Sequence, residues 1–176
     1  MGDAMPDPGR GRELPAGTVT FDVELDVAAD GGAFCRLAVD LDAYTAVEPA
    51  LSRAAWIDPP PIGVGSRAAV EGHIPFSVAA VRRFIGEPSG TATLTEFAPP
   101  TNVAYTLETA RAAGFLRAVF RESGSGNTVV AVSGWITPQS RGARLALAPW
   151  TGVLRALANR AVGRGVRRAD AAVRRG

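Results

Sequence analysis

The spacing of apolar residues changes near Pro149, and this change constrains the fold of the chain more than any other feature. Upstream, several segments alternate apolar with polar residues, most clearly at Val19, Phe21, Val23, Leu25 and Val27. That period of two is typical of a β-strand with one buried face. Downstream, apolar residues recur at helical spacing, at Trp150, Val153, Leu154, Leu157, Ala161 and Val162. The pattern predicts a helix over 149–173 with one apolar stripe.

Turn residues divide the segment before this helix into shorter predicted elements. Asp30 precedes apolar residues at helical spacing, so it is expected to cap a pair of short helices that ends near Val47. Further strands are predicted at 53–58, 67–72, 90–97, 102–110, 113–122 and 128–137. Residues 74–85 are apolar without strict alternation, and a strand, a short helix and a lid over a cavity all remain open for them. An antiparallel sheet with one dry face must bury it, so the sheet is expected to curl around the C-terminal helix and leave a cavity.

The length of 176 residues suits one domain. Residues 1–16 are rich in Gly and Pro and are expected to form a disordered leader, with a single domain over 17–176. No signal-peptide core and no apolar run of about 18 residues occurs, so we expect a cytoplasmic protein without a transmembrane segment. All 19 basic residues are arginine, which is typical of a GC-rich, bacterial genome.

Five segments together resemble a known family: 23–30, 37–44, 56–58, 62–67 and 95–105, the last with Pro99-Pro100 between two predicted strands. The chain resembles the polyketide cyclase/dehydrase and lipid-transport group (SRPBCC) of the START, or Bet v 1-like, superfamily. The resemblance implies an α+β helix-grip fold, a curved antiparallel sheet around a long C-terminal helix with two short helices after the first strand. It also implies a cavity for lipids, polyketides or isoprenoids. Only some members catalyse a reaction, and no catalytic residue is carried over from them.

His73 is the only histidine and follows a predicted strand. A histidine can move protons near neutral pH, so His73 is the candidate acid or base for a cyclisation or dehydration. The alternative is a rim residue without a role. With one histidine and one cysteine, no metal site or cofactor is expected.

Large apolar and aromatic side chains are the candidate ligand contacts, because an aromatic ring with a polar handle suits a ring-bearing ligand. They are Trp56, Phe76, Tyr105, Phe120, Trp135, Trp150 and Leu154. Core packing is the alternative for each of them. On 113–122, burying unpaired arginine is expensive, so Leu116, Ala118 and Phe120 are expected to point inward and Arg117 and Arg121 outward.

The charge is unevenly distributed: residues 141–176 contain nine arginines and one acid, Asp170. A solvated helix face explains this without a partner, and no nucleic acid is expected. The sequence therefore favours a carrier or sensor that binds an apolar small molecule. The alternatives are a polyketide cyclase or dehydratase that uses His73, and a partner-binding protein that uses the arginine-rich helix.

Overall fold

The computed structural model describes residues 14–72, 89–124 and 126–175. Within these ranges the chain forms a sheet and a set of helices. The strands are β1 (Val19–Val27), β2 (Leu51–Trp56), β3 (Arg67–Gly72), β4 (Ser89–Ala98), β5 (Asn102–Thr109), β6 (Ala112–Glu122) and β7 (Thr128–Pro138). The helices are α1 (Gly31–Val39), α2 (Leu41–Val47), α4 (Arg141–Leu147), the 3₁₀ turn η1 (Ala148–Trp150) and α5 (Thr151–Val173).

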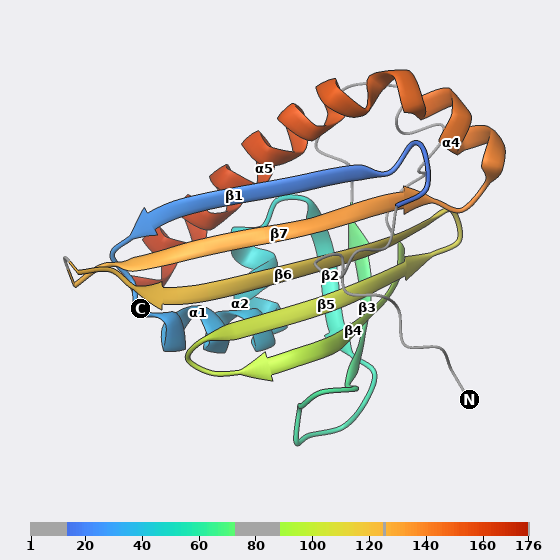
Figure 1. Ribbon diagram of the computed structural model, residues 1–176. Helices are drawn as coiled ribbons and strands as arrows, with labels where there is room; N and C mark the ends of the chain where they lie inside the picture. Colours follow the sequence, from blue (N-terminus) through green and yellow to red (C-terminus); the bar gives the residue numbers. More distant parts are fainter. Residues whose placement is uncertain (1–13, 73–88, 125, 176) are drawn as a thin grey trace.

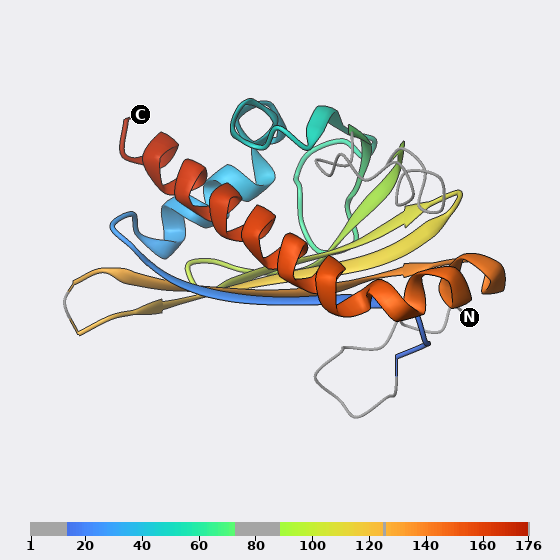
Figure 2. The ribbon, with the colours of Figure 1, turned by 90° about the horizontal axis from the view of Figure 1, so that it is seen from above.

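The strands form one antiparallel sheet in the order β1-β7-β6-β5-β4-β3-β2 (Figure 1). β1 pairs with β7 along its whole length, from Val19 opposite Ile136 to Val27 opposite Thr128. The sheet curves, and α1, α2 and α5 lie on the same side of it (Figure 2). This is the predicted α+β helix-grip arrangement, with two short helices after the first strand and a long C-terminal helix.

In each of the three short helices α1, α2 and α4, the side chain of the N-cap residue accepts a hydrogen bond from a backbone N–H of the first turn. Asp30 Oδ1 accepts the Ala33 N–H at 2.8 Å at the start of α1, as predicted, and Asp40 Oδ1 accepts the Ala43 N–H at 3.0 Å at the start of α2. Ser140 Oγ accepts the Ala143 N–H at 3.1 Å in α4. Each cap satisfies an amide that no carbonyl inside the helix can reach.

The single acid of the arginine-rich segment fixes the end of α5 to the sheet. Asp170 is 8% exposed, and its carboxylate accepts the N–H groups of Ala28 and Ala29 at 3.1 and 3.0 Å, just after β1. The guanidinium of Arg174 lies 2.9 Å away and balances the charge. Hydrogen bonds to an ionised group are among the stronger ones, so this contact locks α5 across the sheet.

β6 faces the core as predicted. Leu116, Ala118 and Phe120 lie on its inner face, and Ala118 and Phe120 are 8% and 7% exposed. On the outer face Arg117 Nε donates to Glu96 Oε2 of β4 at 2.8 Å, across the one intervening strand, β5. Opposite-charge pairing on the wet face therefore accounts for Arg117, which points outward as predicted.

The C-terminal helical region differs from the prediction at its start. Helical structure begins at Arg141, and the 3₁₀ turn η1 separates α4 from α5. Trp150, the last residue of this turn, and Val153 in α5 are 60% and 57% exposed, whereas Leu154 is 5% exposed. The predicted stripe was wrong at those two positions. Arg164, Arg167 and Arg168 are not buried, in agreement with a solvated face.

Three sequence predictions fall wholly or largely on residues that the structure does not describe. They concern His73, the segment 74–85 with Phe76, and residues 1–13 of the leader. No described helix is both long and apolar enough to cross a bilayer.

Candidate functional site: an apolar cavity

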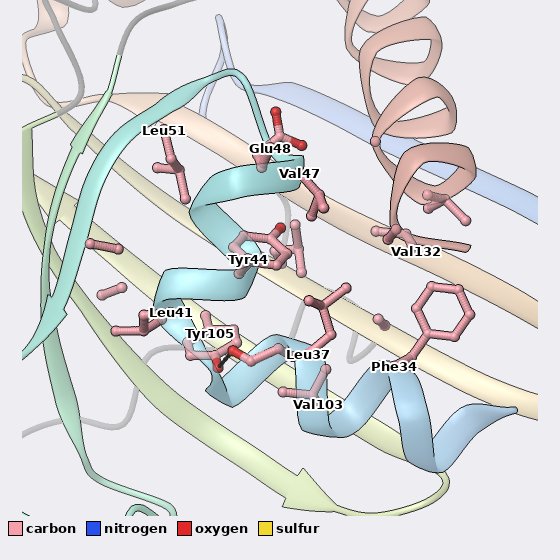
Figure 3. Close-up of a pocket in the computed structure, with 18 of the residues that line it drawn as sticks. Phe34, Leu37, Leu41, Tyr44, Val47, Glu48, Leu51, Val103, Tyr105 and Val132 are labelled. Carbon is pink, nitrogen blue, oxygen red and sulfur yellow. Dashed lines mark hydrogen bonds between the residues drawn. The ribbon is translucent and has the colours of Figure 1, made fainter. Parts of the chain in front are cut away.

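A cavity of about 300 Å³ lies between the concave face of the sheet, the helices α1 and α2, and the second half of α5. Figure 3 shows side chains from α1, α2 and the sheet pointing into it. Its lining comprises Phe34, Leu37, Ala38, Leu41, Tyr44, Val47, Glu48, Leu51, Ala54, Ala68, Val70, Ala92, Val103, Tyr105, Leu107, Leu116, Ala118, Phe120, Val130, Val132, Val162, Gly165, Val166 and Ala169. Nearly all of these side chains are apolar.

Small residues create the space. The lining includes an alanine from each of α1, β2, β3, β4, β6 and α5: Ala38, Ala54, Ala68, Ala92, Ala118 and Ala169. Protein interiors are normally packed to crystal-like density, so a position with a short side chain leaves room unless a neighbour fills it. Here inward positions of β2, β3, β4 and β6 all carry alanine, so the short side chains leave space along this part of the sheet.

An aromatic pair forms part of the cavity wall. The rings of Phe34 on α1 and Phe120 on β6 stack, with centroids 5.5 Å apart and planes 17° apart. Stacked rings present a flat apolar wall and add to the stability of the α1–β6 contact. This wall contains one of the predicted ligand contacts, Phe120.

Three polar side chains reach the cavity from the described part of the chain: Tyr44 on α2, Glu48 just after it, and Tyr105 on β5. The Tyr105 hydroxyl donates to the Ala38 carbonyl at 2.7 Å and so ties β5 to the end of α1. Burial, helped by the negative charge of Glu48, raises the pKa of Tyr44 to about 12. Burial also raises the pKa of Tyr105, with smaller contributions from Tyr44 and Cys35. Both phenols are therefore neutral at physiological pH.

Glu48 stands where α2 approaches α5. Its Oε1 accepts the Ala50 N–H at 3.0 Å, which fixes the carboxylate at the end of the helix. Its Oε2 would lie 2.8 Å from a Cβ placed on Gly165 of α5. A residue larger than glycine at position 165 would push this carboxylate away, so glycine permits the close approach.

Two of the seven predicted ligand contacts, Tyr105 and Phe120, line the cavity. Trp56 is outside the lining, and its indole N–H donates to the Val39 carbonyl at 3.0 Å. Trp135 is 5% exposed but is out of phase with Val130 and Val132, so it projects from the opposite face of β7. These two tryptophans therefore take part in the packing of the fold and do not form part of the cavity wall.

The other predicted contacts fall elsewhere. Leu154, in the first half of α5, is buried in the core, and Trp150 is exposed. Neither side chain lines the cavity. Phe76 and the candidate acid or base His73 lie outside the described residues. Within the described part of the chain, no group of three or more His, Cys, Asp and Glu side chains is arranged to hold a metal ion.

Sequence reasoning missed the face of α2. Leu41, Tyr44 and Glu48 all line the cavity, and their spacing of three and four residues places them on one side of a helix. The segment 44–47 was not predicted as part of the site because it contains a single aromatic residue. The signal that identifies it is a tyrosine and a glutamate at i and i+4, on the same side of a short helix as the apolar Leu41.

Comparison with known proteins gives the fold. No family model and no curated protein matches the sequence. Among solved structures, the di-domain ARO/CYC protein StfQ of the steffimycin biosynthetic pathway superposes with a TM-score of 0.67 at 13% identity, over 90% of this chain and 52% of that one. This chain thus spans about half the length of StfQ.

Two further structures match over nearly their whole length. A protein from Thermus thermophilus gives a TM-score of 0.65 at 12% identity, over 88% of this chain and 96% of its own. The major latex-like protein 151 of Panax ginseng gives 0.62 at 11% identity, over the same two shares, 88% and 96%. At such identities the similarity establishes the fold, which is the Bet v 1-like helix-grip fold.

Proposed function

We propose that this protein binds an apolar small molecule, such as a lipid, a polyketide or an isoprenoid, in the cavity and acts as its carrier or sensor. The observation that supports this most strongly is the lining: apart from Tyr44, Glu48 and Tyr105, the described residues around the cavity have no polar side chains. Removing apolar surface from water contributes about 25 cal/mol per Å², so such a ligand gains free energy over most of its surface. The proposal places the protein in the cytoplasm of a bacterium.

The cavity geometry also supports a role in binding. Ligand sites typically combine a mostly apolar concave surface with a few polar groups that fix orientation. Here the polar groups lie together at α2 and β5 and leave the remaining walls apolar, so an amphiphile would bind in one orientation. No nucleic acid partner is proposed, because the arginines on the solvated face of α5, Arg164, Arg167 and Arg168, lie outside the lining of this site.

Fluorescence of the neutral probe N-phenyl-1-naphthylamine tests the proposal. We expect the wild-type protein to enhance its emission saturably, and Ala118→Trp to abolish the effect, because the indole fills space between the sheet and α5. Ala55→Trp is the matched control, since Ala55 is exposed on β2 and lies outside the lining. Circular dichroism reports whether each variant folds.

A second cavity-filling variant guards against misfolding of the first. Val166→Trp introduces the same bulk from α5, where the residue is half-buried and borders the cavity. Probe binding that survives in folded Ala118→Trp and Val166→Trp proteins would place the ligand elsewhere. Native mass spectrometry of protein purified from its own host would then identify any co-purified ligand.

A second candidate function is a polyketide cyclase or dehydratase, and the similarity in fold to StfQ favours it. It requires a proton-transfer group at the cavity, and His73 is the candidate from sequence. If the protein is such an enzyme, His73→Ala retains ligand affinity and lowers turnover by about 10²–10⁴-fold. If it is a carrier, the substitution leaves ligand binding unchanged and there is no turnover to lose.

A further inference from the structure

The three polar side chains of the cavity are arranged in a row, and their hydrogen-bonding capacities differ. Tyr44 lies between the other two: its pKa responds to the charge of Glu48, and the pKa of Tyr105 responds to Tyr44. Figure 3 shows Glu48 and Tyr44 on successive turns of the α2 segment, with Tyr105 below them on β5. A ligand that reaches this wall therefore meets all three groups together.

Most of the capacity left in this row is for accepting hydrogen bonds. The Tyr105 hydroxyl already donates its one hydrogen bond to the Ala38 carbonyl, so its oxygen can only accept further hydrogen bonds. The Glu48 carboxylate accepts only, and one of its oxygens is already bonded to the Ala50 N–H. The Tyr44 hydroxyl has no hydrogen-bond partner among the described residues and can rotate to accept from a ligand or to donate to Glu48.

The charge of the row is negative. Among the described residues that line the cavity, Glu48 is the only ionisable acid or base apart from the tyrosines, and no arginine is among them. An anion held in an apolar pocket beside a carboxylate suffers both desolvation and like-charge repulsion. A neutral group that donates hydrogen bonds avoids the repulsion and satisfies oxygens that otherwise face an apolar space.

We infer that the cavity selects amphiphiles whose polar end donates hydrogen bonds, an alcohol or a protonated amine, and rejects carboxylates and other anions, through Glu48, Tyr44 and Tyr105. This inference rests on the proposed function and specifies its ligand class. An isoprenoid alcohol or a phenolic polyketide fits the class, whereas an ionised fatty acid does not.

The test uses decanol, decylamine and decanoate, which share one tail and differ in the head group. Each competes with N-phenyl-1-naphthylamine for the wild-type protein at pH 7. Decanol and decylamine are expected to displace the probe, and decanoate to require at least about tenfold higher concentration, which corresponds to about 1.4 kcal/mol. If decanoate displaces the probe as well as decanol does, the inference is overturned.

Glu48→Gln identifies the residue responsible. The amide keeps the shape and one acceptor but removes the charge, so decanoate should gain affinity, decylamine should lose it, and decanol should change least. Glu122→Gln is the matched control, because Glu122 is exposed at the end of β6 and lies outside the lining. An unchanged head-group preference in folded Glu48→Gln protein would contradict the assignment to Glu48.

A second variant covers the case in which Glu48→Gln does not fold. Gly165→Ala keeps the charge but displaces the carboxylate, whose Oε2 would be 2.8 Å from the new Cβ. The head-group preference should weaken in this variant, and an unaltered preference counts against the inference. The proposed function fails in a separate way: neither the neutral probe nor any of the three amphiphiles then binds the wild-type protein.

Discussion

The two halves of α5 contact the rest of the molecule differently. In the first half, Leu154 and Ala158 are buried in the core, and Asn159 Oδ1 accepts the Asp22 N–H of β1 at 3.0 Å. In the second half, Val162, Gly165, Val166 and Ala169 border the cavity. Figure 2 shows the helix crossing the curved sheet obliquely, so one half lies on the strands and the other lies across from α1 and α2.

This comparison shows how the fold retains empty space. A cavity costs stability because its lining loses dispersion contacts. The first half of α5 offsets that cost by packing Leu154 and Ala158 into the core, and Asp170 ties the far end to the residues after β1. The helix is thus held on both sides of the cavity, and the residues between are available to contact a ligand.

The largest expected effect contrasts packing in the two halves. Leu154→Ala should lower the free energy of unfolding by about 2–5 kcal/mol, because Leu154 is 5% exposed in the core. Val166→Ala should cost less than about 1 kcal/mol, since Val166 is half-buried and already borders empty space. Urea denaturation measures both, and equal losses would show that the second half is packed as closely as the first.

The next effect concerns the tyrosines, both of which line the cavity. Burial raises the pKa of Tyr44 from 10.0 to about 12, so the folded state keeps a proton that the unfolded state releases. The free energy of unfolding should therefore be unaffected below pH 10 and fall as the pH rises from about 10 to 12.

Absorbance at the tyrosinate band after a rapid pH jump shows whether burial keeps the two tyrosines protonated. Folded protein should show no phenolate step near the ordinary tyrosine pKa of about 10, whereas protein in urea should show one. A phenolate step at that pH in folded protein would mean that water reaches the cavity wall freely.

The smallest expected effect compares two glycines of α5. Each Gly→Ala change gains about 1 kcal/mol of helix propensity. At Gly163 the new Cβ would lie 3.8 and 3.9 Å from Val23 and Leu25, an ordinary contact, so the gain should be realised. At Gly165 displacement of Glu48 should offset part of it. Thermal melts of the two variants should differ in that order, and the reverse order would contradict the close approach of Glu48.

The fold was predictable because it depends on periodicity. Alternation located most of the strands closely, and the change of period located the long helix. The helix α4 was missed because a segment of seven residues is too short to establish a helical period, although the cap at Ser140 marks its start. The phase of the stripe was wrong at Trp150 because a 3₁₀ turn precedes α5, which sequence spacing does not reveal.

The site was less predictable, for a physical reason. The prediction searched for large aromatic side chains, but bulky residues fill space, and alanines at positions such as 54, 68 and 118 leave it. Whether an inward alanine creates a cavity depends on the distance to the facing helix, which is set by the curvature of the whole sheet. Only Tyr105 and Phe120, which combine an aromatic ring with an inward position near that gap, were found from sequence among the described lining residues.

The most direct test of the central claim is methyl NMR of α5 during titration with a neutral amphiphile such as decanol. Val162 and Val166 border the cavity, whereas Leu154 lies in the packed half of the same helix. Binding in the cavity predicts saturable shifts of the Val162 and Val166 methyl resonances with little change at Leu154. Saturable shifts at Leu154 or on the exposed Val153, with Val162 and Val166 unmoved, would contradict the account.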